Sequence, residues 1–257
     1  MSHVALQRFL NRLLLRSQLS ASDRAAVLKL PFAQQRVDLH RDVIVPGTTV
    51  EHCLLVASGW AARFDQLASG YREIVAVYLP GDMCDLHSLA VPTAGWGIQA
   101  LGNTEFLQVP HASLRTIVER SPDLGRAFWR DTTADASILA KWVCNRGRRQ
   151  SLRRLAHLLC ELGIRSEQAG TGTRTLFELR ATQNQLAEML GVTPVHTNRV
   201  LQMVRQSQLV STVGTMIHVH DWEKLVRLGE FDPAYLLLDR IPERSGSAGR
   251  LTVTASE

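Results

Sequence analysis

The chain has 257 residues, of which 45% are hydrophobic and 21% charged, with a formal net charge of +5 and a pI near 9.4. This composition is typical of a globular protein of about two domains, and it excludes a disordered or membrane-embedded chain. No apolar run approaches the roughly 18 residues of a membrane-spanning helix. The start of the chain is interrupted by Arg8, Arg12 and Arg16, so it does not resemble a signal peptide. We therefore expect a cytoplasmic protein that has no membrane partner and whose positive charge favours polyanions.

The cysteines and histidines of the sequence do not predict a metal site. The four cysteines form no C-x-x-C pair and none lies in the first fifty residues, so we expect no structural zinc, no disulfide framework and no amino-terminal iron–sulfur cluster. His40, His52 and His87 lack the spacing of metal ligands. The sequence also lacks G-x-S-x-G, a phosphate-binding loop and H-E-x-x-H. We therefore predict that the protein is not an enzyme and keep a metalloenzyme as a minor alternative.

The first half of the chain changes from a helical to a strand pattern. Residues from about 4 to 30 read as helix. Short apolar runs punctuated by glycine then extend from about Val37 to Val109 and predict a barrel or sandwich of short strands. The clearest runs are Val43–Val45, Cys53–Val56, Ile74–Tyr78 and Glu105–Val109. We assign residues 1–121 to a first domain that contains this helix and the strands.

A long helix is expected to follow, from Pro122, a favourable first helical residue, to about Asn145. Two interpretations of its apolar stripe remain open. We favour a two-helix dimer interface, and the alternative is packing on the protein's own barrel. The stripe consists of Leu124, Phe128, Ile138, Leu139 and Trp142. A hinge is predicted at Asn145–Gly147, so the long helix and hinge occupy residues 122–147.

Basic residues cluster between the long helix and the rest of the chain. They are Arg146, Arg148, Arg149, Arg153 and Arg154. Contact with nucleic-acid phosphates and a solvated helix face are equally good interpretations of this cluster. A further helix is predicted over Leu152–Leu162, at the start of a domain of residues 148–235. Residues 236–257 are assigned to a carboxy-terminal tail, and its part after Pro242 is expected to be mobile.

The most informative pattern lies between Thr182 and Val219. Thr182, with Gln185 three residues later, predicts a helix start with a capping box, and Gly191 ends that helix. Thr193 and Pro194 open a second helix as its N-cap and first helical residue. The second helix turns Val195, Val200, Leu201 and Val204 inward and His196, Asn198, Arg199 and Gln202 outward. Together they predict a helix-turn-helix. The segment Val210–Val219, with Gly214 at its tip, predicts a hairpin wing.

These patterns resemble the Crp/Fnr family of bacterial transcription regulators. The resemblance covers the chain up to about Asp221 and rests on PGD at Pro80–Asp82, RRLAHLLCEL from Arg153 and QNQLAEMLGVTPVHTNRVLQ from Gln183. It implies an α+β fold with an amino-terminal cyclic nucleotide-binding-like β-roll (jelly roll), a long dimerisation helix and a carboxy-terminal winged helix-turn-helix. It also implies a homodimer that binds a near-palindromic operator in double-stranded DNA, with RNA polymerase as a further candidate partner.

The resemblance makes residues 193–205 the recognition helix. Of three positions that usually touch bases in the family, the first two fall on Pro194 and Val195 and the third on Arg199. Arg199 is suited to a bidentate contact with guanine, and the alternative for this side chain is an intramolecular salt bridge. Val195 is suited to contact with a thymine methyl group. Other candidates for base or phosphate contact are His196, Asn198 and Gln202. Phosphate contacts are expected from Thr182, Gln183 and Thr193.

The sensor half departs from the cyclic AMP pattern of the family. Ala94 and Gly95 stand where the resemblance requires the phosphate-binding Arg-Ser pair, and Leu139 and Ala140 replace the hydroxyl residues that read adenine. Asp82 is retained near the place of a ribose hydroxyl. We therefore expect an effector other than cyclic AMP, of unknown identity, or no effector at all. The expected pocket residues are Asp82, Met83, His87, Ala94, Gly95 and Leu139.

The run GDMCDLHS at Gly81–Ser88 suggests a different cofactor. It resembles the segment that supplies haem ligands in carbon monoxide-sensing members of the family, with His87 at the histidine position. Asp85, however, stands at the position of the cysteine ligand in those members, and Cys84 lies one residue before it. The first thirty residues also contain no proline to match the amino-terminal proline ligand that the resemblance implies. A haem-based gas sensor using His87 therefore remains an alternative. An alternative of another class is a β-roll interaction module that does not bind DNA.

Overall fold

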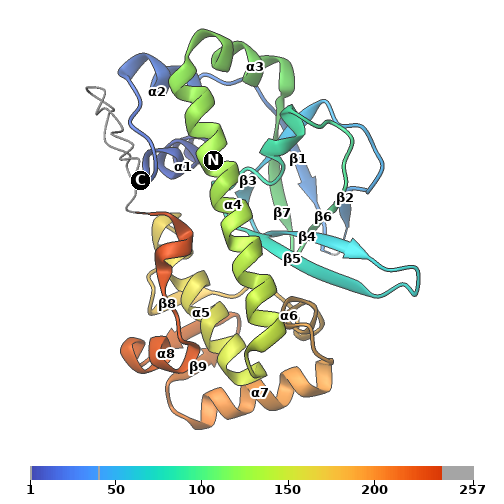
Figure 1. The fold of residues 1–257 in the computed structure, drawn as a ribbon, viewed down its shortest axis with the longest axis vertical. Coiled ribbons are helices and arrows are strands. Elements are labelled where there is room, and N and C mark those ends of the chain that lie inside the picture. The colour runs from blue at the N-terminus through green and yellow to red at the C-terminus, as the bar shows by residue number, and fades with distance from the viewer. Residues whose placement is uncertain (1, 40, 239–257) are drawn as a thin grey trace, which may run out of the picture.

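The computed structural model describes residues 2–39 and 41–238, and three parts follow one another along its length (Figure 1). At the amino-terminal end, α1 (Ser2–Leu14) and α2 (Ala21–Leu28) replace the single helical segment expected over residues 4–30. The helices are separate because Ser20 caps α2, accepting a hydrogen bond from the Asp23 N–H in a reciprocal capping box.

A β-roll of two antiparallel sheets packs against these helices. One sheet has the order β1-β7-β3 and the other the order β2-β6-β4-β5. The strands are β1 (Ala33–Val37), β2 (Asp42–Ile44), β3 (His52–Ser58), β4 (Ala61–Gln66), β5 (Arg72–Tyr78), β6 (Gly97–Ala100) and β7 (Thr104–Pro110), with a 3-10 turn η1 (Leu86–Leu89) between β5 and β6. All four predicted strand runs are confirmed. Gly97 is required in β6 because a Cβ there would lie 2.1 Å from the Phe64 ring.

The long helix is confirmed and extends further than expected. After α3 (His111–Arg120), α4 spans Pro122–Arg148, with Ser121 as N-cap and Pro122 in the first turn. The hinge predicted at Asn145–Gly147 is wrong, because these residues are helical. The backbone becomes extended at Arg149 and Gln150 instead.

The prediction that the large apolar side chains of α4 form a dimer seam is also wrong. Leu124 and Phe128 are buried against α1, where the Phe128 and Phe9 ring centroids lie 6.0 Å apart. Ile138 and Trp142 join a core cluster with the carboxy-terminal helices, and Leu139 packs on the β-roll. The helix therefore uses this stripe within its own subunit, which is the alternative that the sequence left open.

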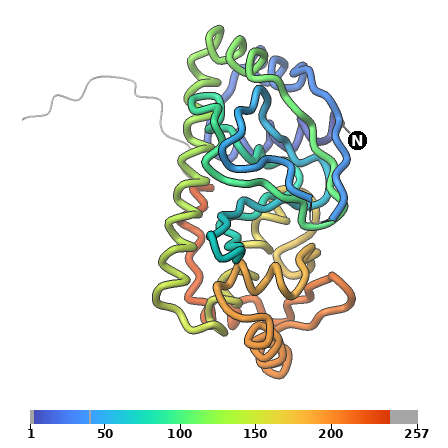
Figure 2. Tube along the Cα trace, turned by 90° about the vertical axis from the view of Figure 1, so that its right-hand side faces the viewer, coloured from blue at the N-terminus to red at the C-terminus, as the bar shows by residue number. Residues whose placement is uncertain are grey.

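The opposite face of α4 is exposed and forms a second stripe. Its residues recur at alternating spacings of three and four, the repeat of a helix that packs on another helix. They are Trp129, Thr133, Ala136, Ala140 and Val143. In Figure 2, α4 lies along one edge of the molecule and the β-roll covers one side of it.

The carboxy-terminal part is a winged helix, as the sequence predicts. A three-stranded sheet of order β8-β10-β9 lies beside the helices, and Gly214 turns the wing with a φ of +60°. Its elements are α5 (Ser151–Gln168), β8 (Leu176–Glu178), α6 (Gln183–Leu190), α7 (Pro194–Gln206), β9 (Val210–Val213), β10 (Met216–Val219), α8 (Trp222–Gly229) and a 3-10 turn η2 (Pro233–Leu236).

The two ends of the molecule share one hydrophobic core. Trp60 and Leu79 of the β-roll belong to the same cluster of buried side chains as Leu155 and Leu159 of α5. Leu236, the first residue of the predicted tail, is buried, and its carbonyl accepts hydrogen bonds from Arg16 at 2.7 and 3.2 Å. This start of the tail therefore packs on the rest of the chain, and the part after Pro242 that is expected to be mobile lies outside the described residues. No helix within the described ranges is long and apolar enough to cross a membrane.

Candidate nucleic-acid interface and effector site

Local hydrogen bonds shape the helix-turn-helix as the sequence predicts. The Thr182 hydroxyl accepts the Gln185 N–H at 3.2 Å, and the Gln185 side-chain oxygen accepts the Thr182 N–H at 2.8 Å. Gly191 ends α6 in the left-handed conformation, with a φ of +62°. Thr193 then caps α7 by accepting the His196 N–H at 3.3 Å. The capping prediction is therefore confirmed at both helices.

One face of α7 packs inward and the other is open to solvent. Thr197, Val200, Leu201 and Val204 are buried. Val195, which the sequence places inward, is instead 77% exposed, because the first turn of α7 projects beyond the core. The other predicted contact residues that are exposed are Thr182, Gln183, Thr193, Pro194, Asn198, Arg199 and Gln202. Figure 1 shows α7 at the end of the molecule farthest from α2 and α3.

His196 differs from the rest of this set. It is half-buried, and its Nε2 lies 2.7 Å from the Ser151 hydroxyl at the start of α5. The side chain therefore positions α7 on α5, and it is less free to reach a base than its neighbours.

Two arginines of α7 are exposed without a protein partner. Within residues 2–39 and 41–238, neither Arg199 nor Arg205 forms an ion pair or a side-chain hydrogen bond, so the salt-bridge alternative for Arg199 finds no support. The sequence interpretation missed Arg205. Its position three residues after Gln202 and seven after Asn198, on the same face as those two, is the helical spacing that identifies it.

Neither phosphate contact nor a solvated helix face describes the whole arginine cluster before the winged helix. The Arg146 guanidinium donates to the carbonyl oxygens of Glu188 at 2.5 Å and Met189 at 3.2 Å, and Arg154 donates to that of Leu190. These carbonyls end α6, where an unpaired C-terminus favours a cation. Arg146 and Arg154 therefore fix the helix-turn-helix to the end of α4. Arg149 and Arg153 pair with Glu230, and Arg148 is exposed.

Comparisons with known proteins agree with this geometry. Residues 153–228 match the Crp-like helix-turn-helix domain. The chain is 24% identical over 173 residues to the transcriptional activator protein anr of Pseudomonas aeruginosa, covering 67% of this chain and 70% of the relative. It is 21% identical over 188 residues to the fumarate and nitrate reduction regulatory protein of Vibrio cholerae, covering 73% and 75%. Residues 153–228 therefore form a Crp-like helix-turn-helix domain, and most of the chain is similar to transcription regulators of the Crp/Fnr type.

Solved structures show that the likeness in fold extends through both halves of the chain. FixK2 from Bradyrhizobium japonicum aligns with a TM-score of 0.71 at 20% identity, covering 77% of this chain and 98% of FixK2. A CooA mutant from Carboxydothermus hydrogenoformans aligns with a TM-score of 0.61 at 19% identity, covering 77% and 88%. The α+β architecture predicted from the sequence is confirmed, and the family is one of DNA-binding regulators rather than enzymes.

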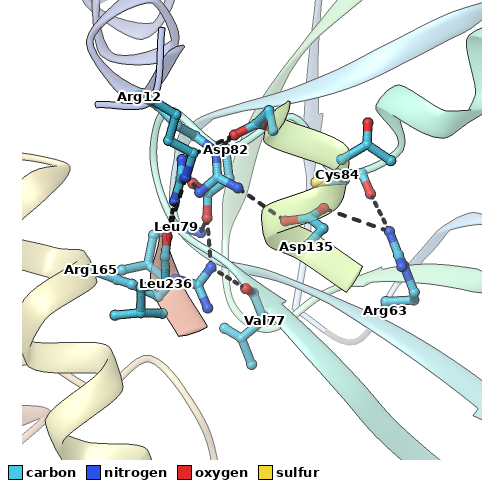
Figure 3. A network of polar contacts seen from close by, with 12 residues as sticks. Arg12, Arg63, Val77, Leu79, Asp82, Cys84, Asp135, Arg165 and Leu236 are labelled. Carbon is cyan, nitrogen blue, oxygen red and sulfur yellow. Dashed lines mark hydrogen bonds and ion pairs between the residues drawn. The ribbon is translucent and has the colours of Figure 1, made fainter. Parts of the chain in front are cut away.

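Asp82 is not available to a ribose, contrary to the sequence interpretation. Its Oδ1 binds Arg12 at 2.7 Å, and its Oδ2 binds Arg165 at 2.8 Å and the Leu79 N–H at 2.9 Å (Figure 3). Burial alone raises the pKa of Asp82, but the charges of Arg12 and Arg165 outweigh it and lower that pKa. The carboxylate therefore ties α1, the β-roll and α5 together.

The other predicted effector residues do not form one pocket. Met83 is buried among the side chains that face α1, and Gly95 is exposed. His87 and Ala94 line a space of about 10 Å³ inside the β-roll, whereas Leu139 lines a larger cavity beside α4. Since about 10–15 Å³ is needed to hold one water, the space near Ala94 is effectively filled.

This filled space also bears on haem. The His87 ring is half-buried, and burial, followed by the charge of Arg63, lowers the pKa of His87 to about 4, so the ring is neutral at pH 7. A neutral imidazole suits a metal, but a space of about 10 Å³ next to it does not accommodate a porphyrin. The residues around His87 therefore do not fit haem. Among the described residues, no three histidine, cysteine or acidic side chains are grouped as metal ligands, and His40 lies outside them.

The sequence interpretation missed a buried cation, Arg63 on β4. It had found no arginine to pair with an effector anion in the Ala94–Gly95 stretch. Arg63 is 5% exposed, its Nη2 donates to the Cys84 carbonyl at 3.0 Å, and the Asp135 Oδ2 lies 4.0 Å away (Figure 3). Arg63 lies on the same face of β4 as Ala61, which packs inside the β-roll, but all of Ala61–Phe64 are buried, so no alternation in the sequence could have singled out the arginine.

Proposed function

We propose that this regulator is a homodimer that binds a near-palindromic operator, with α7 of each subunit entering one major groove. Support comes from one observation above all: α7 presents Asn198, Arg199 and Gln202 to solvent at the end of the molecule, and Arg199 has no partner among the described residues. The guanidinium of an arginine in the first turns of such a helix can donate two hydrogen bonds to O6 and N7 of a guanine. Thr182, Gln183 and Thr193 lie at helix starts, which suits phosphate oxygens.

The exposed stripe of α4 supports the dimer. Its heptad spacing suits a parallel pair of helices, and small side chains such as Ala136 and Ala140 allow close approach of the two. Pairing through this face sets the distance between the two α7 helices. We expect half-sites about one turn of DNA apart, roughly 34–36 Å between centres.

The remaining assignments follow from this one. We take residues 1–121, 122–148 and 149–235 as the sensor part, the long helix and the winged helix, with the second boundary moved to the observed end of α4. RNA polymerase is a further candidate partner, because the relatives include named transcriptional activators. The cytoplasm is the compartment in which bacterial operators lie. An effector other than cyclic AMP is consistent with the filled space beside Ala94.

The experiment is a binding titration of the full chain on DNA. Duplexes selected from a random pool by the protein are labelled, and fluorescence anisotropy is measured at several salt concentrations. The proposal expects a pseudo-palindromic selected sequence and a log–log salt slope of about −0.9 for each phosphate contacted. A pool that yields no enriched sequence, together with binding that does not respond to salt, would point instead to a protein-interaction module.

A further inference from the structure

The chain beyond α8 returns to the long helix as a strap of residues 231–238, which includes η2. The strap, red in both views, runs beside α4 (Figure 1 and Figure 2). Phe231, Tyr235 and Leu236 of the strap are buried. They belong to the same hydrophobic cluster as Ile138 and Trp142 of α4. The strap therefore packs against the long helix as well as against the winged helix from which it comes.

The Tyr235 hydroxyl anchors the strap to a carboxylate that two helices share. It donates a hydrogen bond to Oε2 of Glu161, on α5, at 2.8 Å. Glu161 is fully buried, and its carboxylate also accepts the Nε1–H of Trp142 of α4 at 3.0 Å and an Arg165 N–H at 3.1 Å. A buried carboxylate needs such donors to offset the loss of water. The hydroxyl therefore joins the strap to the contact between α4 and α5.

The Leu236 carbonyl anchors the strap to the amino-terminal part of the molecule. It accepts hydrogen bonds from Nε and Nη2 of Arg16, which follows α1, and Arg16 Nη1 lies 3.3 Å from Oδ1 of Asp131 on α4. Arg16 is itself buried, so its guanidinium depends on these acceptors. The strap is therefore held at both of its polar anchors by groups that also contact α4.

The strap gives the winged helix a second attachment to the long helix. Along the chain, α4 and α5 are joined only through the extended residues Arg149 and Gln150. Each residue has two soft backbone dihedrals, so this short connection alone does not determine how the winged helix is rotated on α4. Together with the ion pair between Arg165 and Asp82, the strap removes that freedom. It thereby fixes the direction of α7 relative to α4.

We propose that the strap determines which spacing of operator half-sites the dimer accepts. This inference rests on the proposed DNA-binding function. One base pair added between two half-sites moves them about 3.4 Å apart and rotates one against the other by about 34–36°. Two α7 helices that are held firmly on paired α4 helices do not follow this change, whereas loosely held ones do. The strap is a positioning element, because it acts on DNA only through the placement of α7.

The test compares the full chain with the double variant Arg16→Gln, Tyr235→Phe, which removes both polar anchors and keeps the ring at position 235. Fluorescence anisotropy is measured on the selected operator and on duplexes with one or two base pairs added or removed between the half-sites. The wild-type protein should bind the altered duplexes about tenfold more weakly or worse, and the variant about threefold more weakly or less. A general loss of stability would weaken binding to all duplexes alike and leave this ratio unchanged.

A matched control makes the same two changes away from the strap. Arg24 and Tyr71 are exposed, so the double variant Arg24→Gln, Tyr71→Phe should keep the wild-type ratio.

Limited digestion with trypsin tests the attachment without DNA. Arg149 donates a hydrogen bond to the carbonyl of Glu230, the residue directly before the strap, at 3.1 Å. Release of the strap should therefore loosen this contact, and cleavage after Arg149 should be severalfold faster in the Arg16→Gln, Tyr235→Phe variant than in the wild-type protein.

Several results would overturn the proposal. They are a wild-type spacing ratio in the strap variant, the same change of ratio in the control variant, and equal rates of cleavage after Arg149. If circular dichroism shows that the double variant does not fold, Tyr235→Phe alone is measured, and an unchanged ratio there also contradicts the proposal. If the protein binds no DNA in any condition, the proposed function fails and the role in spacing fails with it, whereas the digestion still decides whether the strap attaches the winged helix.

Discussion

The arginines of this molecule behave differently in two regions. Where α1, α4, α5 and the β-roll meet, Arg12 and Arg165 are buried and bind the Asp82 carboxylate from two sides (Figure 3). On α7, Arg199 and Arg205 are exposed and have no protein partner within the described part of the chain. The first group holds the two halves of the molecule together. The second group remains available to an external polyanion.

The contrast predicts opposite responses to mutation. Removing one member of a buried ion pair leaves the other charge desolvated without compensation, and this destabilises the fold strongly. Removing an exposed, unpaired arginine leaves nothing uncompensated, so the fold is unaffected and only binding changes. Stability and DNA affinity should therefore be controlled by separate sets of arginines and their partners.

The largest effect is expected from Asp82→Ala. Arg12 keeps Asp131 and Asp135, and Arg165 keeps Glu161. The two guanidiniums nevertheless lose the carboxylate between them in a buried site, so we expect a loss of about 3 kcal/mol in the free energy of unfolding, at the low end for a broken buried ion pair. Urea denaturation followed by circular dichroism measures it. Asp123→Ala, which removes an exposed pair with Arg126, is the control and should cost about 1 kcal/mol or less. Equal losses in the two variants would show that the buried network does not hold the halves together.

A second prediction concerns pH and His157, which is buried between the rings of Phe231 and Tyr235. Burial lowers its pKa from 6.5 to about 4, although Nδ1–H donates to the Gly229 carbonyl. Because the folded state resists protonation, the stability from this residue is complete above pH 6.5 and is lost as the pH falls towards 4.

The variant His157→Phe lacks this proton-linked loss. Between pH 7 and pH 4.5 the wild-type protein should lose about 2 kcal/mol more than the variant, because this interval covers most of the shift between the unfolded pKa of 6.5 and the folded pKa of about 4. Thermal or urea denaturation at several pH values measures the difference. Parallel pH profiles for the two proteins would show that His157 titrates normally, and that its burial is not maintained in solution.

Arg199→Ala tests the other side of the comparison. Loss of a bidentate contact with guanine should weaken operator binding by about 1–3 kcal/mol and relax the preference at one base pair of each half-site. The melting temperature should not change. Arg126→Ala, at an exposed arginine on α4 far along the chain from the winged helix, serves as control in the same anisotropy assay. Unchanged discrimination between operator and mutated operator would remove Arg199 from the interface.

The smallest effect concerns the two faces of α4. Ala136→Asp places a carboxylate on the exposed stripe, and in a symmetric dimer it meets its own copy, so we expect dimerisation to weaken about tenfold or more. Sedimentation equilibrium measures the change. The same substitution at Ala112, exposed on α3, leaves the dimer unaffected if the stripe is the interface. Equal dimerisation in both variants would place the interface elsewhere.

The sequence predicted the winged helix well because its signals are local. Thr182, Gln185, Gly191 and Thr193 make their capping contacts within a few residues of themselves, so sequence spacing determines the geometry. Asp82 instead binds Arg12, 70 positions away, and Arg165, 83 positions away. No periodicity reveals such pairs, and the family pattern therefore assigned Asp82 to an effector.

The long helix was misread for a different reason. It carries two stripes, one of large apolar residues such as Leu124 and Trp142 and one of smaller residues such as Ala136 and Ala140. Both repeat every three or four residues, so helical spacing alone does not say which one faces the β-roll. Side-chain size does not decide it either, because the exposed stripe also carries Trp129 and Val143.

The most direct test of the account is a hydroxyl-radical footprint of the full chain on its selected operator. We predict two protected regions that are related by the dyad of the operator and whose centres lie about 10–10.5 base pairs apart. Protection of both regions should weaken in Arg199→Ala. A single protected region, or two regions unchanged by Arg199→Ala, would contradict the claim that the exposed face of α7 contacts DNA in each of the two subunits.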